Sequence, residues 1–147
     1  GREKRGEIYL AGLLHDVGKL LVYRAASVRD VNESPTPALV HRLVGELHPA
    51  IGLLAVHAWQ LAASVAGGVG FHHAPELAPD EARQMARTLW IADVAIHTAE
   101  QAQLGRECGG LIALSTLDAL HVEPAALIEK AHGLLAQFDE SKSVAKG

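Results

Sequence analysis

The 147-residue sequence has few of the residues that mark several large protein classes. A single cysteine, Cys108, excludes an internal disulfide and a thiolate metal cluster, as is typical of cytoplasmic proteins. The net charge of −4 and the lack of a basic stripe argue against direct nucleic-acid binding. No apolar run of membrane-spanning length is free of glycine, histidine and charge, and no signal-peptide pattern is present. These absences predict a cytoplasmic protein that does not bind membranes.

The residues that are present predict an ordinary globular chain. Apolar residues make up 49% of the sequence and charged residues 20%, which excludes a disordered chain. The length suits one compact domain, expected over residues 1–140 and followed by a flexible tail at 141–147. Nine histidines are the unusual feature of the composition, so the search for a functional site begins with them.

Apolar residues recur at helical spacing along almost the whole chain, and no stretch alternates with period two. The pattern predicts an all-α fold. Pro49 and the Pro-containing or Gly-rich segments divide the expected helices, and Asp80 is a good N-cap. The expected helices cover residues 3–26, 38–47, 49–61, 62–73, 81–103, 114–120 and 123–138, with loops at 27–37 and 74–79.

The stretch "LAGLLHDVGKLLV", residues 10–22, places His15, Asp16 and Lys19 inside an apolar helical run. Burying such groups without partners costs several kcal/mol, so the trio needs partners. His15 and Lys19 are four residues apart and Asp16 and Lys19 are three apart, which makes them neighbours on one face of a helix.

Further polar residues interrupt the later apolar helices, namely His48, the pair His72–His73, and Asp93. Imidazole and carboxylate groups are suitable ligands for divalent Mn, Fe, Zn or Mg. Helix bundles build metal sites from residues that project inward from facing helices. A metal ion would also supply the positive charge that buried carboxylates need.

A second interpretation of these residues needs no metal. A single histidine on an apolar helix is more often a hydrogen-bonded core residue, and Asp93 could instead hold a helix end or a buried arginine. The other histidines are interpreted as surface or packing residues: His41, His57, His97, His121 and His132.

The order "HDVGK", then His48, then "HH", then a helical Asp93 resembles the HD superfamily of metal-dependent phosphohydrolases. More narrowly, "AGLLHDVGKLLV…E…HPAIGLLAVHAWQLAASVAGGVGFHHAPE" resembles the HDOD domain of bacterial signalling proteins, over residues 7 to about 100. Trp59 and the spacing from His48 to the histidine pair fit that pattern. The resemblance implies an HD-domain-like helical bundle, with trailing helices up to about Phe138.

The sequence departs from the related families at two places. HDOD domains begin with further helices, one of which carries an earlier metal-ligating histidine. The resemblance therefore implies that the chain is a C-terminal portion of the domain, and the apolar surface left by missing helices would favour self-association. In the neighbouring HD-GYP family, the histidine pair is followed by Gly-Tyr-Pro, whereas "APELAPDEARQ" follows it here. This difference argues against hydrolysis of cyclic-di-GMP.

The resemblance also implies a ligand set for a divalent Mn, Fe, Zn, Ni or Mg ion. Asp16 would anchor the metal, and Asp16 and Lys19 would be the catalytic residues, with Lys19 neutralising charge on a phosphate. In a two-metal arrangement, His15 and Asp93 would join Asp16 in the first site. The implied ligands are His15, Asp16, His48, His72, His73 and Asp93.

The function implied by the resemblance is that of a signalling output module. Such a module would bind a signalling protein or a small phosphorylated ligand, with a vestigial or structural metal site. The alternative is a divalent-metal-dependent phosphohydrolase acting on a nucleotide or another phosphoester, so the sequence leaves open whether the protein is an enzyme. A plain helical interaction domain whose histidines are core residues is the third interpretation.

Overall fold

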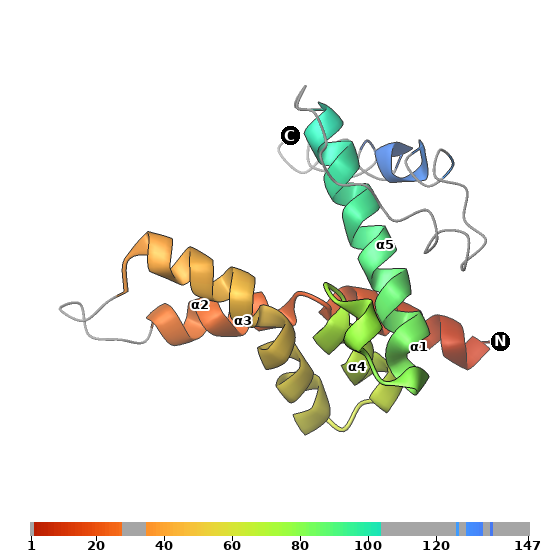
Figure 1. The fold of residues 1–147 in the computed structure, drawn as a ribbon, viewed down its shortest axis with the longest axis horizontal. Helices are drawn as coiled ribbons and strands as arrows, with labels where there is room; N and C mark the ends of the chain where they lie inside the picture. Colours follow the sequence, from red (N-terminus) through yellow and green to blue (C-terminus); the bar gives the residue numbers. More distant parts are fainter. Residues whose placement is uncertain (1, 28–34, 104–125, 127–128, 134–135, 137–147) are drawn as a thin grey trace, which may run out of the picture. The chain divides into compact units, whose positions relative to one another are not determined.

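The computed structural model describes residues 2–27, 35–103, 126, 129–133 and 136, and within them every regular element is helical. The predicted all-α helical bundle is therefore confirmed for this part of the chain. The elements in order are α1 (Arg2–Leu14), α2 (Val17–Ser27), α3 (Pro37–Ala58), α4 (Ala63–Phe71), the 3₁₀ helix η1 (Pro75–Leu77) and α5 (Asp80–Gln103) (Figure 1).

The chain divides into two compact units, residues 1–90 and 91–147, and α5 begins in the first unit and ends in the second. In the second unit, Ala95 and Ala99 form a small buried cluster with Ala131. Residues 129–133 are helical, as predicted for 123–138, whereas the expected helix at 114–120 and the tail at 141–147 lie outside the described residues. The single domain expected over residues 1–140 stays a prediction.

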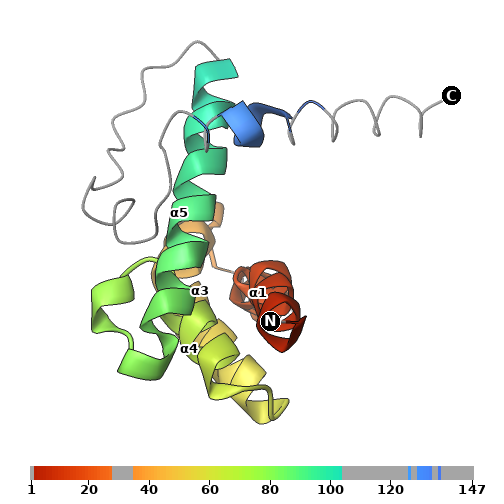
Figure 2. The same cartoon turned by 90° about the vertical axis from the view of Figure 1, so that its right-hand side faces the viewer.

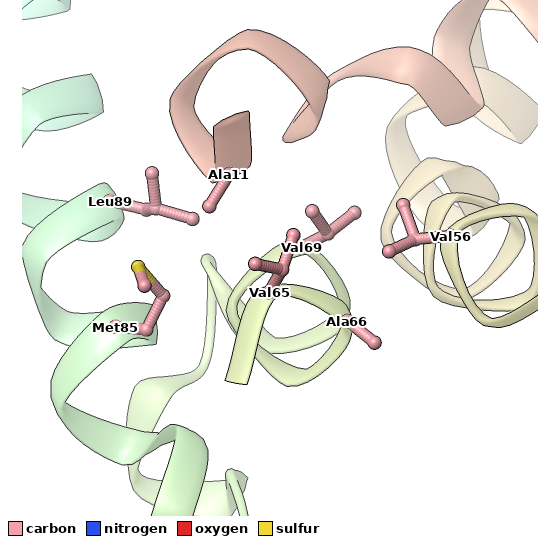
Figure 3. Packing of buried hydrophobic residues seen from close by; sticks show 7 residues of the cluster. All are labelled: Ala11, Val56, Val65, Ala66, Val69, Met85 and Leu89. Atoms are coloured by element: carbon pink, nitrogen blue, oxygen red, sulfur yellow. The ribbon is translucent and has the colours of Figure 1, made fainter. Parts of the chain in front are cut away.

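The core of the first unit is built around α4, which contacts α1, α3 and η1 (Figures 1 and 2). The buried side chains of Val65 and Val69 lie between Met85 and Leu89 of α5 and Val56 of α3 (Figure 3). Burial of each valine stabilises the fold by about 1.5 to 3 kcal/mol. This packing outweighs the weak helix propensity of the glycine-rich α4.

The expected helix 3–26 is wrong in one respect, because it is two helices separated by a turn at His15 and Asp16. The N–H of Lys19 donates to the carbonyl oxygen of Asp16 at 2.9 Å and starts the second helix. Consecutive residues of a continuous helix point about 100° apart. The turn removes this restriction, so both side chains can face the same histidines.

The two helices expected on either side of Pro49 form one helix, α3, and His48 lies in its interior rather than before a helix. Proline removes one backbone donor and crowds the carbonyl four residues earlier, at a cost of about 3 kcal/mol. Here that earlier residue is Gly45, which has open space around it. Packing of α3 against α2 and α4 keeps the helix continuous.

The remaining helix boundaries agree closely with the sequence pattern. The expected helix 62–73 is α4, and the expected helix after Asp80 is α5. Thr36 caps α3 by accepting a hydrogen bond from the N–H of Leu39 at 3.3 Å. The predicted loop at 74–79 contains the short helix η1.

Among the described residues, α3 is long and apolar enough to cross a membrane when judged by length and composition alone. Its inner face carries the buried residues Val44, His48 and Gly52, and it packs against α2 and α4. A core helix of a globular protein passes the same test, so this helix is weak support for a membrane span.

The backbones of α2 and α3 touch where Gly18 faces His48 and Gly52. A Cβ atom at Gly18 would overlap the carbonyl oxygen of His48 and would lie 2.9 Å from the backbone nitrogen of Gly52. Only glycine permits this approach. The contact therefore fixes the position of Lys19, the next residue of α2, relative to His48.

We expect Gly18→Ala to lower the free energy of unfolding by about 1 to 3 kcal/mol, because the new methyl group overpacks the helix contact. The matched control is Gly45→Ala, an exposed helical position where an added Cβ would have nothing within 4 Å. That change should raise the free energy of unfolding by about 0.5 to 1 kcal/mol. Urea denaturation measures both values, and a Gly18→Ala variant as stable as the wild type contradicts the contact.

Candidate metal centre

Four imidazole rings gather around one carboxylate in the first compact unit. His15 and Asp16 come from the turn between α1 and α2, His48 from the middle of α3, and His72 and His73 from the end of α4. The ring centroids of the contacting pairs lie 4.1 to 5.2 Å apart. We call these five residues the histidine cluster.

Backbone carbonyls fix the direction of the rings. The Nδ1 atoms of His48 and His72 lie 2.8 Å and 2.7 Å from the carbonyl oxygens of Val44 and Val69 in their own helices. His15 makes the equivalent bond to the carbonyl three residues earlier, at 2.7 Å. A carbonyl oxygen only accepts, so each Nδ1 carries the proton and each neutral ring presents a lone pair at Nε2.

The Nε2 atoms converge at the spacing of ligands that share one ion. The Nε2 of His48 lies 3.3 Å from the Nε2 of His72 and 3.1 Å from the Nε2 of His73. Zn–N bonds of about 2.0 to 2.1 Å in a tetrahedral site place neighbouring nitrogens roughly 3.3 Å apart. Ligand atoms of all three histidines lie within 4.8 Å of one another, so they could hold a metal ion.

The carboxylate of Asp16 supplies a fourth possible ligand atom, an oxygen. Its Oδ2 accepts a hydrogen bond from Lys19 Nζ at 2.7 Å, which turns Oδ1 toward the rings. Oδ1 lies 3.4 Å from His48 Nε2 and 4.0 Å from His72 Nε2, and it is buried without a hydrogen-bond partner among the described residues. Such an orphaned acceptor costs about 1 to 3 kcal/mol. A bound cation would remove this cost, so the residues fit a metal.

The protonation behaviour of the cluster favours a metal ion over a shared proton. Burial, with a smaller contribution from the neighbouring histidines, lowers the pKa of His72 to about 4, although its hydrogen bond to the Val69 carbonyl acts in the opposite direction. Burial would raise the pKa of Asp16, but the hydrogen bond from Lys19 and the positive charge of that residue lower it below its usual value. Near neutral pH, the cluster therefore combines a carboxylate with at least one neutral buried imidazole.

The structure brings together five of the six metal ligands implied by the sequence, and it places Lys19 beside them. Asp93 lies half-buried on α5 in the second compact unit, so its part in the site stays a prediction. His15 and Lys19 were expected on one helical face, but His15 belongs to the turn and Lys19 to α2. His41, His57 and His97 are exposed, as expected for surface residues.

Sequence reasoning missed the groups that orient the ligands. The carbonyl oxygens of Gly12, Val44 and Val69 carry no signal in the residue type, because every residue has one. Gly18 did carry a signal, since a glycine inside an apolar helical run suggests close backbone contact.

Comparison with known families gives one match, in which the HDOD domain matches residues 1–75. No curated protein and no solved structure matches the chain. The match covers the N-terminal half of the chain and includes the histidine pair. The match therefore falls in the N-terminal part of the chain, and it ends at residue 75 rather than near residue 100, where the expected resemblance ended. The expectation that the chain is a C-terminal portion of the domain stays a prediction.

We expect the metal-free protein to lose about 3 kcal/mol of stability as the pH falls from 6.5 to 4. The unfolded chain protonates His72 at its ordinary pKa of 6.5, whereas the folded chain does so only at a pKa of about 4. The unfolded state therefore binds more protons throughout this window. The lowered pKa of Asp16 adds a loss only below its ordinary value of 3.8.

Urea denaturation in the presence of a chelator, repeated from pH 7.5 to 4.5, measures this slope. A His72→Gln variant should flatten it, and a variant of the exposed histidine, His57→Gln, should keep it. Equal wild-type stability at pH 7 and pH 5 would count against a neutral, buried His72.

Proposed function

The chain belongs to the HDOD domain family, and we propose that it is a bacterial signalling output module that binds one divalent metal ion. His48, His72, His73 and Asp16 would be the ligands. Family membership suggests an output module of the HD-like superfamily. The observation that carries the proposal is the buried, unpartnered Oδ1 of Asp16, which faces converging imidazole nitrogens. A cytoplasmic location fits the single cysteine.

The donor set narrows the identity of the ion. Imidazole nitrogens suit Zn, Fe and Ni, whereas all-oxygen sites suit Mg. Three imidazoles and one carboxylate therefore favour Zn, Fe or Ni over Mg. When bound, such an ion supplies Lewis-acid chemistry and joins segments that are distant in the sequence.

Lys19 positions Asp16 and adds a cation at the edge of the cluster. Its ammonium group holds Oδ2 of Asp16 at 2.7 Å, while its side chain remains 40% exposed. Because this side chain is partly open to solvent, its positive charge can attract an anionic group. We propose that the module recognises a small phosphorylated ligand or a signalling protein at this edge.

Hydrolysis of a phosphoester is the second candidate function, and the same pair of residues favours it. Oδ1 of Asp16 points toward the imidazole rings. Lys19 is bonded to the other oxygen of Asp16, where its positive charge could neutralise charge on a phosphate. In this alternative, Asp16 would help to hold the metal ion, and Lys19 would bind the phosphate oxygens.

We expect the purified protein to bind one equivalent of Zn²⁺ or Mn²⁺, and His73→Gln to weaken that affinity at least about tenfold because one ligand is lost. His73 is the exposed member of the triad, so its replacement leaves the core intact. Calorimetric titration and metal analysis of chelator-free protein give the affinity and the stoichiometry.

The matched control is His57→Gln, which changes an exposed histidine of α3 outside the cluster and should bind metal like the wild type. Asp16→Asn should weaken binding as well, because it removes the charge of the oxygen donor. Equal metal affinity in the wild type and His73→Gln would eliminate the proposed ligand set.

For an output module without catalysis, we expect the metal-loaded wild type to hydrolyse phosphoesters no faster than Asp16→Ala. The panel should include an aryl phosphodiester, nucleoside monophosphates and diphosphates, and cyclic dinucleotides. A wild-type rate about 100-fold above the rates of both Asp16→Ala and Lys19→Ala would establish the hydrolase instead.

A further inference from the structure

An apolar groove runs between α2 and α3 on the first compact unit. Its volume is about 460 Å³, and all ten residues that line it are apolar. We call it the α2–α3 groove and define it by six of them, Leu21, Val22 and Ala25 of α2 and Leu43, Leu47 and Ile51 of α3. Leu47 is 42% exposed, so the groove presents hydrocarbon to solvent.

The groove exists because the apolar stripe of α3 is wider than the surface that α2 covers. Val44 and His48 are buried on its inner face. Leu43 and Leu47 stand beside that face and remain partly open to solvent. A pair of helices with an apolar side buries that side against further helices in stable bundles. The helices α2 and α3 form a hairpin (Figure 1), and the groove between them is the part of that hairpin suited to a partner.

The charges on the rims of the groove indicate the nature of that partner. Arg24 follows Leu21 by three residues and Glu46 follows Leu43 by three, so each charged residue is a surface neighbour of an apolar residue that lines the groove. Both residues are exposed. The groove therefore has a basic residue beside it on α2 and an acidic residue beside it on α3.

The two charges also lie at the same height along the hairpin. Gly18 touches the backbone of Gly52, which sets the register of the two antiparallel helices. Arg24 lies six residues after Gly18 and Glu46 six residues before Gly52. Both are therefore about 9 Å from the contact, at a rise of about 1.5 Å per residue. A surface with opposite charges at equal height on its two rims is complementary to itself.

We propose that a second copy of this chain docks on the α2–α3 groove. A two-fold axis along the groove places α2 of one copy over α3 of its partner, so that Arg24 faces the partner's Glu46 and the reverse pair forms as well. Neighbouring helices are then antiparallel, as in a four-helix bundle. Glu46 is available for this pairing, because its contact with Arg42 in the same helix is long, at 4.0 Å, and exposed.

The size of the groove sets the expected affinity. Ten lining residues per copy are fewer than the roughly 20 to 30 of a standard stable interface. The dimer should therefore dissociate in the micromolar range. None of the lining residues belongs to the histidine cluster, so the dimer should form with or without a bound metal.

Sedimentation equilibrium of the full chain from about 1 to 300 µM tests the proposal. The wild-type mass should rise from 15.6 kDa toward twice that value. Leu47→Glu should remain monomeric, because it places a charge in the groove. The control Leu77→Glu changes a leucine that is 72% exposed and outside the groove, and it should dimerise like the wild type.

Charge reversal tests the arrangement without altering the apolar surface. Arg24→Glu and Glu46→Arg should each raise the dissociation constant of the dimer about tenfold, because each change appears twice in the interface. The double variant Arg24→Glu/Glu46→Arg should restore the wild-type value. A monomeric wild type throughout the range overturns the proposal and assigns the groove to a different occupant. A dimer that is insensitive to the charge reversals, or one not restored by the double variant, also overturns it.

Discussion

The structure depends most on the inward direction of the imidazole lone pairs. Each ring bound to a carbonyl of its own helix has a proton at Nδ1 and none at Nε2, so His48 and His72 point bare nitrogens at one another across 3.3 Å. Asp16 points a buried, unpartnered oxygen at the same space. Lone pairs held this close with no proton between them repel one another. A bound cation would attract all of them and so remove the repulsion.

The packing of the helices brings these nitrogen and oxygen atoms together. Gly18 lets α2 touch α3, and the unbroken α3 carries His48 into the interior despite Pro49. The valines of α4 hold its end, with His72, against the same core. Because the donors come from separate helices, ion binding would add to the stability of the packed unit rather than to any single helix.

The hairpin of α2 and α3 contributes to two different features. Its helix α3 carries the buried His48 into the histidine cluster, and α2 and α3 together line the α2–α3 groove. The histidine cluster gathers polar atoms that a cation would satisfy, whereas the groove gathers hydrocarbon that another apolar surface would cover. The residues that line the groove are separate from those of the histidine cluster.

The sequence by itself determined the helical class, most helix positions and the residue types of the site, because period and ligand chemistry are local properties. It could not determine the break at His15 and Asp16 or the continuity through Pro49, since both depend on what packs against those segments. The sequence could not predict the direction of each imidazole either. The backbone carbonyls that fix this direction occur in every residue and therefore leave no pattern in the sequence. Tertiary structure decided which atoms meet: only folding brings ligand atoms of His48, His72 and His73 within 4.8 Å of one another and an oxygen of Asp16 to 3.4 Å from His48 Nε2.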